Sequence, residues 1–178
     1  MLTEKDIEQF KYAYDTAIRH IIGEDLWNYL ETSGFFTAPA STKFHLNYDG
    51  GLAEHSTNVA SCLLGFTDRL YLKWDRPESP FIVGFLHDLC KADQYIKTPS
   101  GYVWNNNQQI KGHGDKSVAL CEKHNFKLTD EEKACILYHM GSFTDKEHWN
   151  DYTNAIHQYP NVLYTHMADM EATHIVEK

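Results

Sequence analysis

Hydrophobic residues recur at steps of three and four in several stretches of the chain, which is the period of an amphipathic helix. The first stretch follows Thr3 and carries Ile7, Phe10, Tyr14, Ile18 and Ile21. A second, over residues 52–70, has a hydrophobic face of Val59, Cys62, Leu63, Phe66 and Leu70. A third follows Pro160 and aligns Val162, His166, Asp169 and Thr173. These stripes predict a mainly helical protein.

Capping residues mark where two of the helices begin. Thr3 with Asp6, and Thr129 with Glu132, have the spacing of a capping box, in which side chain and backbone bond each other reciprocally. The helix after Thr129 is expected to end at His139. A shorter helix is expected over residues 117–125.

The helical period is interrupted in three places. Residues 35–51 are irregular, with Pro39 and a Gly50-Gly51 turn, and the charged segment SFTDKEHWND at 142–151 is expected to be a solvated loop. The segment YIKTPSGYVW at 95–104 predicts two short strands joined by a turn. We therefore expect one domain over residues 1–178, an all-α helical bundle with one small β-hairpin insertion.

One strongly apolar helix, FIVGFLHDLCK at 81–91, ends by presenting His87 and Asp88 side by side. Ser79 is expected to cap this helix, with Pro80 at its first position. An imidazole beside a carboxylate is costly to bury unless a metal ion or a reacting phosphate satisfies it. This pair is therefore the first candidate for a functional site.

Composition narrows the class of protein. The chain has 178 residues, 42% of them hydrophobic, and no run approaches the roughly 18 apolar residues of a membrane span. The N-terminal residues lack the apolar stretch of a secretory signal, which favours the cytoplasm and no membrane partner. A net charge of −9 argues against a protein that grips long nucleic acid through phosphate contacts. The cysteines at 62, 90, 121 and 135 form no C-x-x-C pair and are expected to be reduced core residues.

Histidine is unusually frequent, with 11 in the chain, and several lie where they would point inward. His55 precedes Val59 by four residues and so shares its buried face. His113 stands between two glycines, which let the backbone approach a metal or phosphate closely. Asp169 lies on the inward face of its helix and needs a partner. These residues are distant in sequence, so only the fold can bring them together.

In this order, the motifs GGLAEHS, FLHDLCKAD, GHGDKS, YHMG and THMADM resemble those of the HD superfamily of metal-dependent phosphohydrolases, named for an adjacent His-Asp pair. The resemblance spans about residues 36–175 and implies an all-helical fold. It implies that His55, His87, Asp88 and Asp169 form a first metal site. It further implies that His113 and His139 join a second, with Asp88 bridging both ions.

The resemblance also implies a cofactor, one or two divalent transition-metal ions. Imidazoles mixed with carboxylates suit manganese, iron, cobalt or zinc, whereas magnesium prefers a site with fewer histidines. Two ions about 3.5–4 Å apart activate a water for attack on phosphorus. The implied activity is thus hydrolysis of a nucleotide or related small phosphate ester by a metal-activated water.

Four residues are candidates for contacts with such a substrate. Lys91 follows Asp88 by one helical turn and can place its ammonium against a phosphate oxygen. Lys116 and Lys43 are further candidate substrate-binding cations, and His45 is a candidate catalytic residue that orients substrate or protonates the leaving oxygen. A structural hydrogen bond for His45 is an equal alternative.

Two other functions remain open. Residues 39–55 are similar to a segment preceding the first histidine in HD domains of a bacterial exoribonuclease group, although Leu46 stands where those have a second histidine. A phosphodiesterase or 3′-5′ exonuclease acting on oligonucleotides is therefore an alternative. A non-catalytic HD module that senses a nucleotide is another. The sequence gives no signal for oligomeric state.

Overall fold

The computed structural model describes residues 3–108, 110–143 and 146–178. Helices dominate it, with one small antiparallel sheet. The helices and strands in chain order are α1 (Glu4–Tyr14), α2 (His20–Thr32), α3 (Gly51–Leu70), α4 (Ser79–Leu86), β1 (Tyr95–Thr98), β2 (Gly101–Trp104), α5 (Gly114–Lys123), α6 (Asp130–Tyr138), α7 (Trp149–Gln158) and α8 (Asn161–Glu171). The predicted all-α fold with a small β-hairpin is confirmed.

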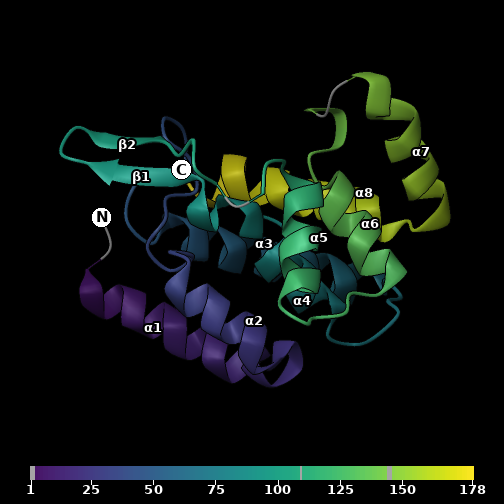
Figure 1. The fold of residues 1–178 in the computed structure, drawn as a ribbon. Coiled ribbons are helices and arrows are strands. Elements are labelled where there is room, and N and C mark those ends of the chain that lie inside the picture. The colour runs from purple at the N-terminus through teal and green to yellow at the C-terminus, as the bar shows by residue number, and fades with distance from the viewer. Residues whose placement is uncertain (1–2, 109, 144–145) are drawn as a thin grey trace.

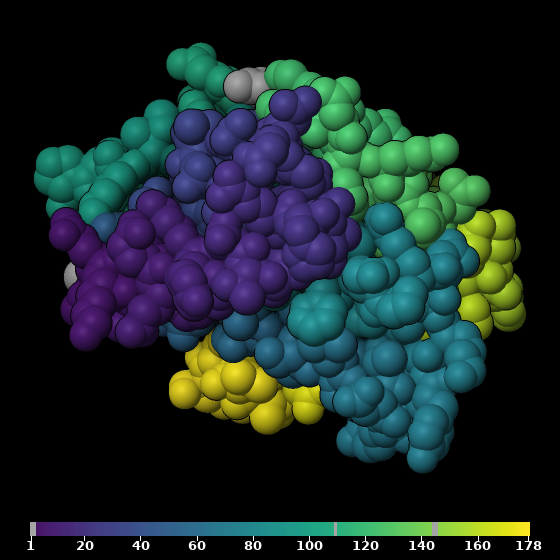
Figure 2. Space-filling model, turned by 90° about the horizontal axis from the view of Figure 1, so that it is seen from below, coloured from purple at the N-terminus to yellow at the C-terminus, as the bar shows by residue number. Residues whose placement is uncertain are grey.

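Helix α3 lies in the middle of the molecule, with α4 and α8 packed against it (Figure 1). The hairpin extends from one side, with Tyr95 paired to Trp104 and Thr98 to Gly101, and α7 lies on the opposite side. Helices α1 and α2, in purple, cover the left and middle of the face seen from below (Figure 2). The chain therefore surrounds α3 with elements drawn from both of its ends.

Buried aromatic residues join the first helices to α3 and α4. The Tyr14 ring contacts Phe35, Phe36 and Phe85 at centroid distances of 4.3–5.6 Å. Its hydroxyl donates a hydrogen bond to the Ala53 carbonyl at 3.0 Å, so the one polar atom of this side chain is satisfied in the core. This contact fixes α1 against the turn of α3 that precedes His55.

Several predicted helix boundaries agree with the structure, but the helix predicted over 81–91 ends at Leu86 and the helix predicted over 117–125 spans Gly114–Lys123. Both capping boxes are present, at Thr3–Asp6 and Thr129–Glu132, and His139 caps the end of α6. Helix α4 instead begins at Ser79, with Glu78 as its N-cap, so the predicted Ser79 cap is wrong. The Ser79 hydroxyl donates to Glu132 Oε1 at 2.8 Å, a tertiary contact that sequence spacing does not reveal.

Helix α7 was not predicted. The segment 142–151 was expected to be a loop, but residues from Trp149 onward are helical. The helix buries Ala155 and half-buries Tyr152 and Ile156, which supply a hydrophobic face against α6 and α8. The charged residues ahead of Trp149 favoured a loop, although Tyr152, Ala155 and Ile156 have the spacing of a helical face.

The described residues contain no helix long and apolar enough to cross a membrane.

Candidate metal centre

Close packing of α3 against α4 sets the position of the first two histidines. A Cβ added to Gly84 would lie 2.4 Å from the Ala60 Cα, so only glycine permits this approach. His55 lies on α3, and His87 caps the end of α4. Helix α8 packs on α3 and supplies Asp169. Three separate helices thus direct side chains to one point.

The chain leaves the α-helical path directly after His87. Asp88 has φ −104° and ψ 19°, and a short 3-10 helix follows over Leu89–Asp93. This change of direction places His87 and Asp88 on the same side of the backbone, although they are adjacent in sequence. Both are almost fully buried, with exposed fractions of 0% and 2%. Their polar atoms therefore depend on protein partners or a bound ion.

Asp88 directs its Oδ2 atom toward a first group of donors. His55 Nε2 and His87 Nε2 lie 3.5 and 3.4 Å from this oxygen and 3.3 Å from each other. Asp169 Oδ1 is 3.3 Å from His55 Nε2. These are the four residues that the resemblance implied for a first metal site, and the fold brings all of them together.

Asp88 Oδ1 faces a second group. His113, which caps the start of α5, and His139, at the end of α6, place their Nε2 atoms 3.3 and 3.6 Å from this oxygen. The two Nε2 atoms are 3.1 Å apart. One carboxylate therefore lies between two pairs of imidazoles, with one oxygen toward each pair.

The other nitrogen of each imidazole is also engaged. His87 Nδ1 donates to the Gly84 carbonyl at 2.9 Å, and His139 Nδ1 donates to the Ile136 carbonyl at 2.7 Å. His55 Nδ1 lies 2.9 Å from Glu177 Oε1, and His113 Nδ1 lies 3.2 Å from the Cys90 sulfur. A partner at Nδ1 fixes the orientation of each ring and leaves Nε2 for the centre of the cluster.

This geometry fits a bound cation. Two Nε2 atoms 3.1–3.3 Å apart must share a proton or a metal ion, because two facing lone pairs repel each other. Nitrogen and carboxylate oxygen are ordinary ligands of divalent transition metals. The described residues thus include buried groups that can hold a metal ion.

The electrostatics of the cluster centre on Asp88 and Lys91. Lys91 Nζ lies 2.6 Å from Asp88 Oδ2. Burial alone would raise the pKa of Asp88, but the charges of Lys91 and His87 hold it well below its usual range. Burial opposes the charge on Lys91 as well, yet the adjacent Asp88 raises the pKa of the ammonium. Asp88 is therefore ionised and Lys91 protonated at neutral pH.

The histidines differ in their affinity for protons. Burial lowers the pKa of His55, but its contacts with Asp169 and Glu177 and the charge of Asp88 outweigh this and raise the pKa to about 9. Burial, only partly offset by Asp88, lowers the pKa of His113 to about 4. In the absence of metal, His55 carries a proton that an incoming cation would have to displace.

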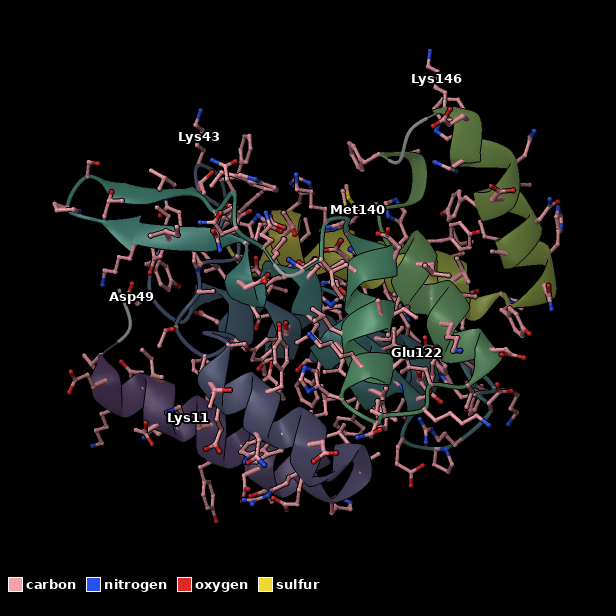
Figure 3. All side chains as sticks on the ribbon, in the orientation of Figure 1. Lys11, Lys43, Asp49, Glu122, Met140 and Lys146 are labelled. Carbon is pink, nitrogen blue, oxygen red and sulfur yellow. The ribbon has the colours of Figure 1, made fainter. Side chains whose placement is uncertain are left out.

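A cavity of about 170 Å³ opens beside the first group of donors. His55, Asp88, Lys91 and Asp169 line one part of it. The rest of its wall consists of His45, Met140, Phe143, His166, Met170 and Thr173. Met140 lies in the middle of the upper surface, between the hairpin side and the α7 side (Figure 3). A larger hollow of about 520 Å³ lies under the hairpin, and no histidine lines it.

The structure does not bring the other two predicted lysines into this cavity. Lys116 was expected to bind substrate, but its side chain is fully buried and pairs with Asp93 and Gln108. That position is not compatible with substrate contact. Lys43 is exposed, and its side chain extends away from the surface into solvent (Figure 3). It does not line the cavity.

His166 lies on α8, in the same helical stripe as Asp169. Its Nδ1 donates to the backbone carbonyl of His139 at 2.8 Å, and its ring lines the cavity. The contact therefore involves the backbone of a candidate ligand and not the imidazole.

Two residues of the centre were not identified from the sequence. Glu177 continues the spacing of Asp169 and Thr173 by four more residues, so the inward stripe of the last helix did contain a signal for it. Cys90 was read as a core residue, and it is fully buried, but its sulfur also contacts His113. Cys90 lies two residues after Asp88, but this spacing does not reveal a contact with His113.

The chain matches no protein-family model, no curated protein and no solved structure.

Proposed function

We propose that the chain is a metal-dependent phosphohydrolase of the HD superfamily that acts on a nucleotide or a related small phosphate ester. One observation carries the proposal: four imidazole Nε2 atoms converge on the two oxygens of Asp88, with the Lys91 ammonium beside them. Such a concentration of buried polar groups is costly unless it binds something. The order of the sequence motifs supports the same family.

In this proposal His55, His87, Asp88 and Asp169 hold one ion, and His113 and His139 hold a second that shares Asp88. When bound, such ions supply a nucleophile at neutral pH and polarise the phosphoryl oxygens. Manganese, iron, cobalt and zinc suit the donor set better than magnesium does.

Lys91 supplies a fixed positive charge at the phosphate. Its ammonium remains protonated beside Asp88 and lines the cavity, where it can donate a hydrogen bond to a phosphoryl oxygen. A preorganised cation of this kind stabilises negative charge that develops in the transition state.

His45 supplies a polar contact on the opposite wall. Its Nε2 atom is buried without a hydrogen-bond partner, and burial and the nearby charge of His55 lower its pKa. A neutral imidazole accepts a hydrogen bond, so His45 is suited to orienting a substrate hydroxyl rather than protonating a leaving group.

The shape of the cavity favours a small substrate. About 170 Å³ accommodates a phosphoryl group and part of an attached organic group. The Phe143 ring, which is 66% exposed, provides an aromatic face at the rim on which a base can stack. A nucleoside phosphate fits these features better than an extended strand does.

The test is phosphate release by purified protein loaded with manganese, using nucleoside mono-, di- and triphosphates, cyclic nucleotides and short oligonucleotides. We expect release from a small nucleotide and its loss in the His87→Ala, Asp88→Ala double variant. Lys127→Met, a change of an exposed lysine outside the cluster, serves as the control. Inertness toward every substrate with metal bound would contradict the proposal.

The same substrates, together with the metal content of the protein, distinguish the alternative functions. Cleavage restricted to oligonucleotides or cyclic nucleotides would indicate a phosphodiesterase or exonuclease. Fewer than one ion per chain with intact nucleotide binding would indicate a non-catalytic sensor. The retention of six candidate metal ligands in one cluster favours catalysis over sensing.

A further inference from the structure

A carboxylate from beyond α8 reaches the metal centre. Glu177 follows a π-helical turn over Ala172–Val176 that continues α8. The side chain of Glu177 is 0% exposed, although the residues just before it are open to solvent. This glutamate is therefore directed inward from an otherwise exposed segment.

One oxygen of this carboxylate receives two hydrogen bonds from α3. His55 Nδ1 lies 2.9 Å and Asn58 Nδ2 lies 3.1 Å from Glu177 Oε1. His55 and Asn58 are three residues apart and hence neighbours on the same helical face. The carboxylate thus contacts the first candidate ligand on the side opposite its Nε2 atom.

A contribution to the stability of the fold does not explain why the Glu177 carboxylate is buried. Burying a carboxylate is costly unless its lone pairs are satisfied, and Glu177 Oε2 has no hydrogen-bond partner. The nearest cationic candidate for Oε2 is His45 Nε2, at 3.8 Å, which is beyond hydrogen-bonding distance. A group kept buried at such a cost is expected to serve the residue it does bind, which is His55.

The partner of His55 Nδ1 differs in kind from the Nδ1 partners of the other candidate ligand histidines. His87 and His139 donate from Nδ1 to neutral backbone carbonyls, and His113 contacts a thiol. Among the described ligand histidines, His55 has a carboxylate at Nδ1. A carboxylate behind a metal-bound histidine fixes its tautomer and makes Nε2 a stronger donor to the ion.

We propose that Glu177 is a positioning residue that orients His55 and strengthens its binding to the first ion, so that the segment after α8 is part of the metal centre. This inference rests on the proposed metal binding, and it does not depend on which substrate is hydrolysed. Asn58 assists by holding the same oxygen in place.

The experiment measures zinc affinity of the full chain by competition with a coloured chelator. Glu177→Ala is expected to weaken binding of the first ion about 10- to 100-fold, the usual effect of removing such a partner. Glu177→Gln keeps an oxygen that accepts from Nδ1 but lacks the charge, so we expect an intermediate loss. Asn58→Ala should weaken binding less than Glu177→Ala.

Glu54→Gln is the matched control. It removes the same charge one residue before His55, but the Glu54 carboxylate accepts from the Tyr48 hydroxyl at 2.7 Å and does not face the cluster. Its zinc affinity should equal that of the parent protein. Circular dichroism and thermal unfolding of each metal-free variant identify any that fails to fold.

A spectroscopic measurement, taken together with the zinc affinity, distinguishes positioning from simple support of the fold. In zinc-loaded parent protein, nitrogen-15 spectra of the imidazoles should show His55 protonated at Nδ1 with a strongly hydrogen-bonded proton. Glu177→Ala should lose that signal, whereas the signals of His87 and His139 should remain. A merely structural role would lower the unfolding temperature and leave the zinc affinity unchanged, even though the signal is lost with the acceptor.

The outcomes separate this inference from the proposed function. Parent-like zinc affinity in Glu177→Ala would overturn the inference alone. Weakened zinc binding in a protein that releases no phosphate would support the inference and contradict only the proposed activity. A parent protein that binds no ion would overturn both.

Discussion

Lys91 Nζ lies 2.6 Å from Asp88 Oδ2, the oxygen that also faces His55 and His87. The ammonium thus occupies the side of the carboxylate that the first metal ion would use. A lysine in this position opposes metal binding through its charge, yet it supplies the cation that a phosphate would meet in the cavity.

Replacing Lys91 by Met should therefore have opposite effects on binding and on catalysis. We expect tighter binding of the first ion, because a competing charge has gone. We also expect kcat/KM for phosphate release to fall by about 10²- to 10³-fold, as when a preorganised charged donor is removed. Titration calorimetry measures the affinity for manganese, and a phosphate-release assay measures kcat/KM. Weaker metal binding in Lys91→Met would contradict this account of the pair.

Replacing Asp88 should reduce metal binding and activity more than replacing His113. Asp88 presents an oxygen to both imidazole pairs, whereas His113 contributes to one. Asp88→Ala should lose both ions and all measurable activity, whereas His113→Ala should keep the first ion and residual activity. Metal content by elemental analysis, with activity on the same samples, checks this. Equal residual activity in the two variants would exclude the bridging role.

Helix packing should control the metal centre through Gly84. A Cβ here would meet the backbone of Ala60, so Gly84→Ala should push α4 away from α3 and cost about 1–3 kcal/mol of unfolding free energy. His87 would move with α4, and metal affinity should fall. Gly65→Ala on α3 is the control, because an added Cβ meets nothing within 4 Å, and it should be neutral or stabilising by up to about 1 kcal/mol. Urea unfolding of metal-free protein and zinc affinity measure both variants.

The metal-free protein should lose stability as pH rises from about 6.5 to about 9. Asp88, Asp169 and Glu177 raise the pKa of His55 from 6.5 to about 9 in the folded state, so folding strengthens proton binding. The resulting stabilisation is complete below the unfolded value and disappears as pH passes the folded value. The raised pKa of His139 acts in the same direction, although burial opposes it.

Thermal unfolding across this pH range measures the effect. His55→Gln should flatten the decline, since it removes the main titrating group. Saturating zinc should reverse the slope, because the ion replaces the proton and binds better as protons become scarce. A metal-free unfolding temperature independent of pH between 6.5 and 9 would contradict the ion pairs around His55.

The sequence contained most of the fold because its helices are individually amphipathic. The stripes of α1, α3 and α8 and the two capping boxes are local features, and most of them appear where the spacing places them. Two details differ: Leu70, at the end of the α3 stripe, is exposed, and a π-helical turn over Asp15–Arg19 separates α1 from α2. Helix α7 was missed because its first residues belong to the charged segment 142–151, although Tyr152, Ala155 and Ile156 already have the spacing of a helical face.

The candidate ligands could be predicted because the motifs that contain them stand in the order found in the HD superfamily, and not because any one residue, such as His113 between two glycines, identifies itself. Their partners could not. Lys116 was assigned to substrate on charge alone, but Asp93 and Gln108 hold it in the interior. Cys90 and Glu177 act through contacts with residues distant in sequence, and no spacing rule reports the partner at the Nδ1 atom of a histidine.

The six candidate ligands come from α3, the end of α4, the start of α5, the end of α6 and α8. An ion held by them would join segments that separate completely on unfolding, so it would bind the folded chain and not the unfolded one. At a free concentration about 100 times its dissociation constant, one such ion adds about 2.7 kcal/mol to stability. The supply of metal in the surroundings would then change how much of the protein is folded and how well it resists proteolysis, in addition to any effect on catalysis.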